Sequence, residues 1–160
     1  MTKLTTIHHS VANPFSDYPR LRSIWPEPYA QQAEHASAVD CQTGQILYIE
    51  QYGAVVGITG IFFEPECPTD IFLRWTGVVP ECRCRGIATE ALRLLAYMCA
   101  SWCPDRKRLI ELVPDNEYGH QVPLPFFTNL GFVPCSVVAH EATDWPVLPY
   151  ALDIEQVRSW

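Results

Sequence analysis

Basic residues are scarce in this chain. Lys and Arg number 11 against 18 Asp and Glu, which gives a formal net charge of -7 at pH 7. A general nucleic-acid-binding surface needs a basic face, so this balance argues against that class of function. The acidic balance is compatible with a cationic amine substrate, and it fits better an acidic surface that serves only solubility.

Long apolar runs are missing as well. No sustained apolar span has the length of a membrane helix, and Met1-Thr2-Lys3 leads into polar sequence rather than into a secretory signal core. The seven cysteines are odd in number and irregularly placed. They predict free thiols in a reducing cytoplasm. Cys82-x-Cys84 lacks zinc-ribbon spacing, and Cys99 and Cys103 have no nearby histidine, so we expect no metal.

The remaining composition predicts one domain over residues 1–160, with an apolar content of 48% that is sufficient for a core. Periodicity and turn residues predict strands at Leu4–Ser10, Gln45–Gln51, Ala54–Phe63, Asp70–Val79, Leu109–Val113, Val133–His140 and Val147–Ile154. Short helices and turns are expected over Pro14–Tyr29, followed by a helix through Gln31, Ala33 and Ala36. This order predicts an α/β (α+β) fold with a mixed, largely antiparallel sheet flanked by helices.

The most informative stretch is the turn between the Asp70–Val79 strand and a helix expected over Ile87–Ser101. The first amides of a helix lack intrahelical acceptors and lie at the positive end of its dipole, so a strand that feeds into a helix creates an anion site. Gly86 lets the backbone approach a ligand closely, and Arg83 and Arg85 add positive charge. The turn therefore predicts a pyrophosphate site.

Arg83-x-x-Gly86-x-Ala88 resembles Gln/Arg-x-x-Gly-x-Gly/Ala, the cofactor motif of the GNAT superfamily of N-acetyltransferases. In that family the motif also follows a strand and opens a long helix. Another strand and a Tyr-x-x-x-Gly-Phe segment come next. Here Leu109–Val113 is the second strand, and the segment from Phe127 to Gly131-Phe132 stands in the final place. The resemblance covers roughly Gln45 to Asp153.

The resemblance implies a sheet that is splayed open between the strands Asp70–Val79 and Leu109–Val113, with acetyl-CoA in the gap. Backbone groups near Val78 and Val79 would pair with the pantetheine arm. The implied contacts of the cofactor are Val78, Val79, Arg83, Cys84, Arg85, Gly86, Ile87, Ala88, Thr89, Asn116 and Phe127.

The catalytic positions of the family are altered in this chain. Relatives such as the arylalkylamine N-acetyltransferases use the tyrosine of the last motif to protonate the leaving thiolate, whereas this chain has Phe127. The positions of the family's base align with Phe72 and Arg74, and neither side chain accepts a proton. The implied asparagine, Asn116, also lies farther from Phe127 than in relatives.

Three titratable residues are candidates for the missing roles. Tyr118 is a candidate acid and His120 a candidate base, although both also fit an exposed loop. Glu111 is a second candidate base, because strand alternation places it on one face with Leu109 and Val113, and an apolar setting would raise its pKa. Alternatively, Glu111 faces solvent or pairs with a nearby arginine.

Two function classes stay open. The first is an acetyl-CoA-dependent N-acetyltransferase in which a primary amine attacks directly. The second is a CoA-binding or partner-binding module that keeps the fold without catalysis, which the phenylalanine at position 127 favours. The acceptor is a small-molecule or peptide amine that the sequence does not identify, and a homodimer is compatible with the sequence. The resemblance implies that N-terminal helices and the last strands build the acceptor pocket, where the aromatic residues are Trp25, Tyr29, Trp145 and Tyr150.

Overall fold

The computed structural model of the 160-residue chain describes residues 5–9, 14–40, 44–137 and 146–160. The elements run in the order β1 (Thr5–His9), α1 (Pro14–Asp17), η1 (Pro19–Ile24), α2 (Tyr29–Asp40), β2 (Gly44–Gln51), β3 (Ala54–Phe62), β4 (Asp70–Val78), η2 (Pro80–Cys82), α3 (Ile87–Trp102), β5 (Arg108–Pro114), α4 (Glu117–Gln121), α5 (Pro123–Asn129), β6 (Val133–Pro134), β7 (Val147–Asp153) and α6 (Ile154–Arg158). The strand order β1-β2-β3-β4-β5-β7-β6 confirms the expected mixed sheet with helices. Within the described ranges, no helix has the length and apolar character needed to cross a bilayer.

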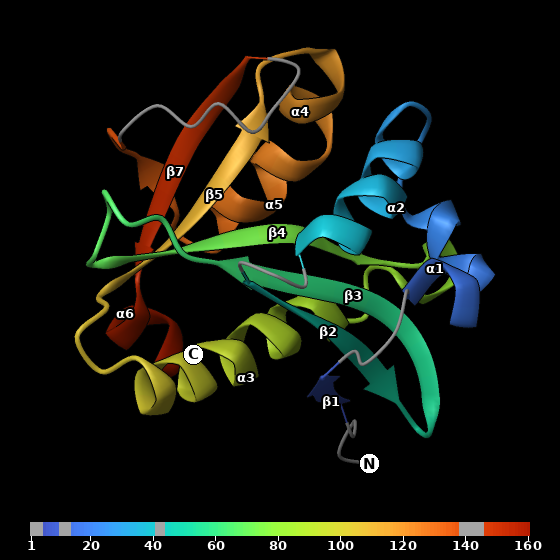
Figure 1. Cartoon of the computed structure of the whole chain (residues 1–160), viewed down its shortest axis with the longest axis horizontal. Coiled ribbons are helices and arrows are strands. Elements are labelled where there is room, and N and C mark those ends of the chain that lie inside the picture. Colours follow the sequence, from blue (N-terminus) through green and yellow to red (C-terminus); the bar gives the residue numbers. More distant parts are fainter. Residues whose placement is uncertain (1–4, 10–13, 41–43, 138–145) are drawn as a thin grey trace. The chain divides into compact units, whose positions relative to one another are not determined.

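The first of two compact units comprises Met1–Phe62 and Arg74–Leu95. Its strands β1, β2 and β3 are antiparallel neighbours, and β2 and β3 form the hairpin that Figure 1 shows in teal and green. Tyr52 and Gly53 both have positive φ values, 52° and 79°, as a two-residue hairpin turn requires. The predicted turn at these two residues is confirmed.

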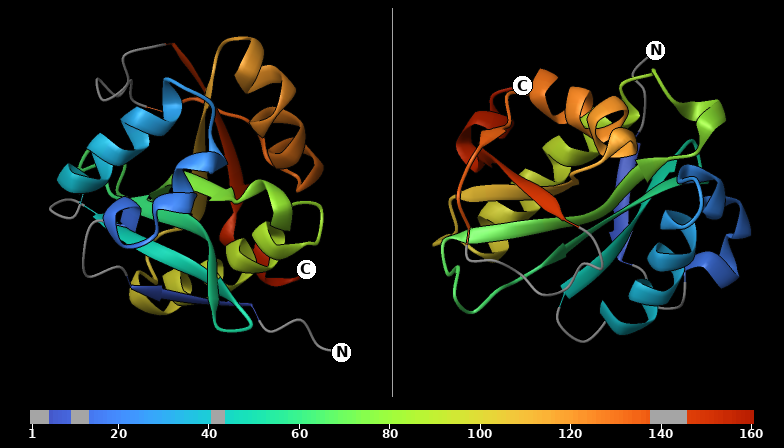
Figure 2. Two further views of the ribbon diagram at one scale, coloured as in Figure 1. Left: turned by 90° about the vertical axis from the view of Figure 1, so that its right-hand side faces the viewer. Right: turned by 90° about the horizontal axis from the view of Figure 1, so that it is seen from above.

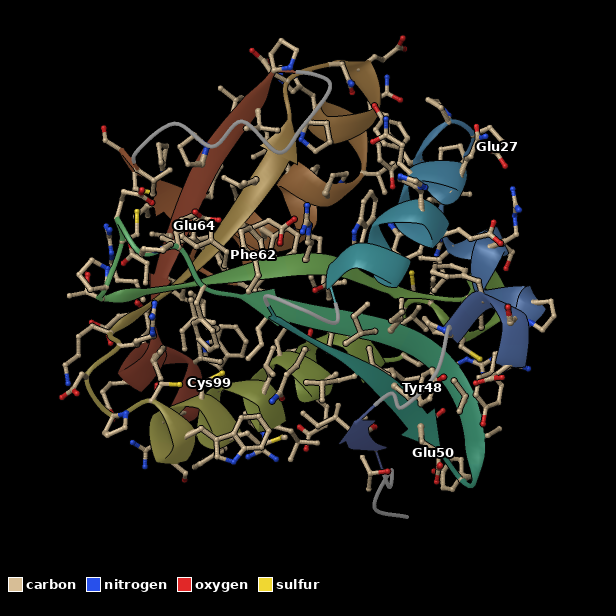
Figure 3. The ribbon with its side chains drawn as sticks, in the orientation of Figure 1. Glu27, Tyr48, Glu50, Phe62, Glu64 and Cys99 are labelled. Atoms are coloured by element: carbon tan, nitrogen blue, oxygen red, sulfur yellow. The ribbon has the colours of Figure 1, made fainter. Side chains whose placement is uncertain are left out.

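This unit contains an apolar core. Strand, helix and turn residues all contribute to it: Phe15, Leu21, Ile24, Ala33, Ile46, Ile49, Val56, Ile58, Val78, Val79, Ile87 and Ala91. Tyr48 of β2, labelled in Figure 3, packs against this core, and its ring lies edge-on to that of Tyr18, with ring centroids 5.0 Å apart. This contact holds the segment after α1 against the hairpin.

The second unit comprises Phe63–Leu73 and Ala96–Trp160. Its longest ladder joins β5 to β7, from Arg108 opposite Asp153 to Pro114 opposite Val147. Helices α4 and α5 contact β5, and both appear in orange beside that strand in Figures 1 and 2. The unit therefore has a short antiparallel sheet with two small helices packed on it.

Strand β4 begins in the second unit and ends in the first. Its first three residues pair in parallel with Arg108–Ile110 of β5. Its later residues approach β3, where the hydroxyls of Thr76 and Thr59 lie 2.9 Å apart. Trp75 has a φ of 54°, a left-handed conformation that interrupts the regular strand.

One of the sequence predictions was wrong at the C-terminal end. Over the described residues 133–137, the strand expected at Val133–His140 is reduced to the two residues of β6, since Pro134 has no N–H to continue a ladder. The strand expected at Val147–Ile154 is confirmed as β7, which ends at Asp153 because the Asp153 carboxylate accepts a hydrogen bond from the Glu155 amide at 2.9 Å and starts α6. Leu4, Ser10 and residues 138–140, which belong to predicted strands, lie outside the described residues, as does Trp145.

Segment 117–121, which the sequence also allowed as an exposed loop, forms helix α4. The Asn116 carbonyl oxygen of the side chain accepts a hydrogen bond from the Gly119 amide at 3.0 Å. A Cβ at Gly119 would lie 1.7 Å from the Pro114 carbonyl oxygen, so the helix packs too closely on the end of β5 for any other residue. Pro123 then occupies the first turn of α5, where its missing N–H costs nothing.

The start of the β4–β5 pairing contains a buried ion pair. Asp70 and Arg108 are register partners, and Arg108 donates through Nε and Nη2 to the two carboxylate oxygens of Asp70, at 2.8 Å each. The Asp70 side chain is only 4% exposed, whereas that of Arg108 is 38% exposed. The pair therefore shields a buried carboxylate, and this carboxylate raises the pKa of Arg108 through the hydrogen bond.

We expect Arg108→Ala to lower the free energy of unfolding by about 3 kcal/mol at pH 7, because it leaves the buried Asp70 carboxylate without a counter-charge. Urea denaturation followed by circular dichroism measures the loss. Arg22→Ala is the matched control, because it removes an arginine from an exposed ion pair with Glu27. Equal losses in the two variants would contradict this account of the buried pair.

Candidate functional site

The turn after β4 is built from consecutive short hydrogen bonds. The Val79 amide donates to Val56 of β3 at 2.9 Å, and the Cys82 and Arg83 amides donate back to Val79 and Pro80 at 2.9 and 3.2 Å. Helix α3 follows, and its first backbone bond runs from the Glu90 amide to Gly86 at 3.0 Å. The predicted passage from strand through turn to helix is therefore present, with η2 inserted in the turn.

Two residues of the turn have left-handed backbone conformations, Cys84 with a φ of 57° and Gly86 with a φ of 77°. Such residues turn successive amides toward one side, which makes a concave anion site. A Cβ built on Gly86 would meet no atom within 4 Å, so the space over this residue is open. Open space and a helix N-terminus meet the requirements for a pyrophosphate at residues 84–89.

The two arginines of the turn differ in position. Arg83 donates from Nε to the Val78 carbonyl at 3.1 Å and from Nη2 to the Ile24 carbonyl at 2.6 Å. Arg85 is exposed on the turn, next to Gly86. Both arginines are exposed, and they differ in that Arg83 bonds the backbone carbonyls of Val78 and Ile24.

Near Trp25, the first unit has an aromatic wall, which we define as Trp25 and Trp75. Their rings pack edge to face with centroids 5.6 Å apart, and Phe15 packs on Trp25 at 6.3 Å. The Trp75 indole N–H is buried without a hydrogen-bond partner among the described residues. A left-handed backbone and an unpaired donor at one residue are features that proteins retain mainly at functional sites.

Phe127 lies in the core of the second unit. It is 3% exposed and packs edge to face between Phe126 and Phe132, at centroid distances of 5.0 and 5.1 Å. Asn116 serves as the N-terminal cap of α4 through its side chain. The two residues thus have structural contacts, and their expected roles at the cofactor stay predictions.

His120 and Tyr118 both lie on α4. The His120 Nε2 is 2.9 Å from an oxygen of Asp115, and the two side chains are 51% and 43% exposed. This solvated pair gives His120 a carboxylate partner at the end of β5. Tyr118 is half-buried on the same helix.

Glu111 is the titratable residue whose setting is most unusual. The residue as a whole is half-buried, but its Oε2 is shielded from solvent and has no hydrogen-bond partner among the described residues. Burial raises the pKa of the Glu111 carboxyl to about 8. The expectation of a raised pKa on an apolar strand face is confirmed, and the alternative pairing with an arginine is not found, because Arg108 bonds Asp70 and Arg106 bonds backbone carbonyls.

Tyr150 is the direct register partner of Glu111 across the β5–β7 ladder. Partners in an antiparallel ladder project to the same face with Cβ atoms about 5 Å apart. Sequence reasoning placed Tyr150 among the pocket aromatics but missed this pairing, since the register of β7 against β5 cannot be read from either strand alone. The ladder therefore brings a carboxyl and a phenol to one face of the sheet.

Over the described ranges, no group of three or more His, Cys, Asp or Glu residues is arranged to hold an ion. Cys99 is buried in α3, and burial raises the pKa of its thiol to about 12, so it stays protonated (Figure 3).

Known proteins resemble the chain in fold and in sequence pattern. The family model described as the acetyltransferase (GNAT) family matches residues 11–132, which is more than half of the chain. A search of curated proteins finds no match.

Solved structures extend the likeness to nearly the full length. An acetyltransferase of the GNAT family from Staphylococcus aureus has a TM-score of 0.72 at 12% identity, over 94% of this chain and 99% of that one. A GNAT acetyltransferase from Elizabethkingia anophelis with acetyl-CoA bound has a TM-score of 0.63 at 11% identity, over 93% and 97%. A spermidine N-acetyltransferase chimera from Vibrio cholerae and hSSAT has a TM-score of 0.67 at 10% identity, over 96% and 97%. At these identities the structures establish the shared fold.

The buried carboxyl of Glu111 leads to a prediction for stability. A raised pKa in the folded state means that this group opposes folding once it must ionise. The penalty is absent below about pH 4.5, grows between the unfolded and folded pKa values, and is complete above about pH 8. We expect Glu111→Gln to be more stable than the parent protein by on the order of 3 kcal/mol at pH 7 and to match it at pH 4.

Urea denaturation at both pH values measures this difference. Glu66→Gln is the control, because Glu66 is exposed and the same change should have little effect at either pH. A Glu111→Gln variant that is less stable at pH 7 would mean that the carboxylate has a stabilising partner.

Proposed function

The chain belongs to the GNAT family of acetyltransferases, and we propose from that premise that it acetylates a primary amine by direct attack on acetyl-CoA. Acyl transfer from acetyl-CoA is the activity of the family and gives the donor. The acceptor class, the direct attack and the assignment of residues are our proposals. The observation that carries them is the buried Oε2 of Glu111, which has no hydrogen-bond partner among the described residues, with Tyr150 as the register partner of Glu111.

Direct attack requires an uncharged amine. A lysine-like amine has a pKa near 10.4, so deprotonating it at pH 7 costs roughly 4.6 kcal/mol without help. A carboxyl whose pKa is raised to about 8 accepts such a proton more readily than an ordinary glutamate. A cationic acceptor would also supply the counter-charge that Glu111 lacks, which supports an ammonium-bearing substrate. The spermidine named for one structural neighbour is an amine of this class.

The proposed reaction uses the two facing side chains in sequence. Glu111 takes a proton from the ammonium ion, and the nitrogen lone pair forms a bond to the thioester carbonyl carbon. The tetrahedral intermediate collapses with cleavage of the carbon–sulfur bond, and the CoA thiolate takes a proton from Tyr150. The nitrogen of the new amide gives its second proton to the Tyr150 phenolate, and Glu111 releases its proton to solvent, which restores both side chains. Tyr118 and His120 remain the alternative acid and base, since both lie on α4 next to the end of β5.

The cofactor is proposed to bind along the turn. Amides of Cys84, Gly86, Ile87, Ala88 and Thr89 hold the pyrophosphate, which Arg85 neutralises, and the arm follows the end of β4 at Val78 and Val79. We further propose that residues 1–160 act as one catalytic domain in the cytoplasm. The odd number of cysteines supports that compartment, and a homodimer is compatible with the proposal.

A CoA-binding module without catalysis is the second candidate, and the burial of Phe127 at the usual tyrosine position favours it. The deciding experiment incubates the protein with acetyl-CoA and spermidine or another amine panel member, and detects acetylated amine by mass spectrometry. Intact-protein mass spectrometry with acetyl-CoA alone tests for an acetyl-enzyme. CoA binding without any acetylated product across the panel would favour the module.

Gly86→Ala tests the placement of the pyrophosphate. We expect the free protein to lose about 1 kcal/mol from backbone strain and CoA affinity to fall at least tenfold, because the new methyl group occupies the open space over the turn. Gly53→Ala is the matched control: its φ of 79° is close to the 77° of Gly86, and its Cβ also meets nothing within 4 Å. Calorimetry measures the CoA affinity of both variants. Equal affinities would mean that the pyrophosphate does not bind at the turn.

The pH dependence of kcat/KM tests Glu111. Its base form exists above its pKa, so kcat/KM should rise with pH through about 8. Glu111→Gln should lower kcat/KM at pH 7 by about 10² or more and remove the inflection, while CoA affinity is retained. Tyr150→Phe should lower kcat by about tenfold and keep the inflection. If Glu111→Gln has the same pH dependence of kcat/KM as the parent protein, Glu111 is not the base, and His120 becomes the candidate.

A further inference from the structure

The guanidinium of Arg83 connects two segments that are far apart in sequence. Its Nε donates to Val78, the last residue of β4, and its Nη2 donates to Ile24, the last residue of η1. The carbonyls at the end of a helix lack intrahelical donors and carry partial negative charge, so a cation there is favourable. Both bonds lie within the first compact unit.

The segment after η1 lies directly on β4. A Cβ at Gly77 would come within 2.2 Å of Ile24 Cγ2 and 3.3 Å of the Trp25 ring, so the strand must carry glycine there. The Trp25 ring also packs edge to face on Trp75 at 5.6 Å. The aromatic wall therefore sits against the part of β4 that runs into the cofactor turn.

Arg20 and Arg83 both hold η1 against the sheet. Arg20, near the start of η1, donates to the Val55 carbonyl of β3 at 2.6 Å, and Arg83 donates to the carbonyl of Ile24 at the end of η1. The planar guanidinium serves this purpose because it presents donors in a fixed fork that reaches two carbonyls at once. A lysine carries the same charge but cannot hold both carbonyls in this way.

We infer that Arg83 is a positioning residue, which couples the cofactor turn to the aromatic wall by holding Ile24–Trp25 against β4, and that its charge is not a main ligand of the pyrophosphate. The two hydrogen bonds of Arg83 thus connect the cofactor turn to the segment that carries Trp25. Its bearing on the acceptor rests on the proposed function, whereas the contact itself does not. The anion site is then left to the amides of the turn and to Arg85.

The test uses CoA as the probe and Trp25 as the reporter. The Trp25 signal is the fluorescence difference between each protein and the same protein carrying Trp25→Phe, with acrylamide quenching as a measure of exposure. CoA affinity is measured by calorimetry at low and high salt. Thermal denaturation confirms that each variant is folded.

We expect Arg83→Gln and Arg83→Lys to behave alike. Both should shift the Trp25 emission to the red and increase its quenching, and both should weaken CoA binding by less than about threefold with an unchanged salt dependence. Arg85→Gln is the matched control, since it removes the same charge from the same turn: it should weaken CoA binding, reduce the salt dependence and leave the Trp25 signal in place.

Two results would overturn the inference. One is an unchanged Trp25 signal in both Arg83 variants. The other is a loss of CoA affinity of tenfold or more in Arg83→Gln that Arg83→Lys restores, which would make Arg83 a charge ligand of the phosphates. Neither result bears on acetyl transfer, so failure here is distinguishable from failure of the proposed function.

Discussion

The pairing of β4 with β5 depends on the ion pair between Asp70 and Arg108. The parallel ladder between these strands has three residue pairs, and its first pair is also the buried carboxylate with its bidentate arginine. A short ladder has few backbone bonds to fix its register, so the charge pair contributes specificity as well as pairing. The last pair joins Phe72 to Ile110, and Glu111 is the next residue of β5. The residue with the unsatisfied carboxyl therefore follows immediately on the last β4–β5 pair.

The sequence predicted most of the fold because its strongest signals are local. Tyr52 and Gly53 lie between two predicted strands and form the turn of the hairpin, and Gly86 lies at the predicted turn before α3, with positive φ at all three residues. The misses have a different cause. Helices α4 and α6 are shorter than two turns, which is too short for hydrophobic periodicity to predict them. Their sequence signals are the N-terminal cap residues Asn116 and Asp153. At β6, apolar composition suggested a long strand that Pro134 prevents from continuing.

The candidate site was predictable only in part, for a physical reason. Strand alternation was sufficient to place Glu111 on an apolar face, and its raised pKa follows from burial alone. The pairing with Tyr150 depends on a register between strands that are more than 30 residues apart. The contacts of Arg83 with Ile24 depend on how η1 folds back on the sheet, which no local pattern encodes. Residues that act through non-local pairing are therefore the ones that sequence reasoning missed.

The Oε2 of Glu111 and the indole N–H of Trp75 are buried without a hydrogen-bond partner in the part of the chain that the structure describes, and Trp75 also has a left-handed backbone. All three features oppose folding. Proteins keep such features where function depends on them, because selection for stability alone would remove them. The resemblance to the family places Phe127 where relatives have a tyrosine, and here the aromatic cluster of Phe126, Phe127 and Phe132 stabilises the second unit. In the proposed reaction the polar chemistry lies instead on the β5–β7 ladder, where Glu111 and Tyr150 are register partners.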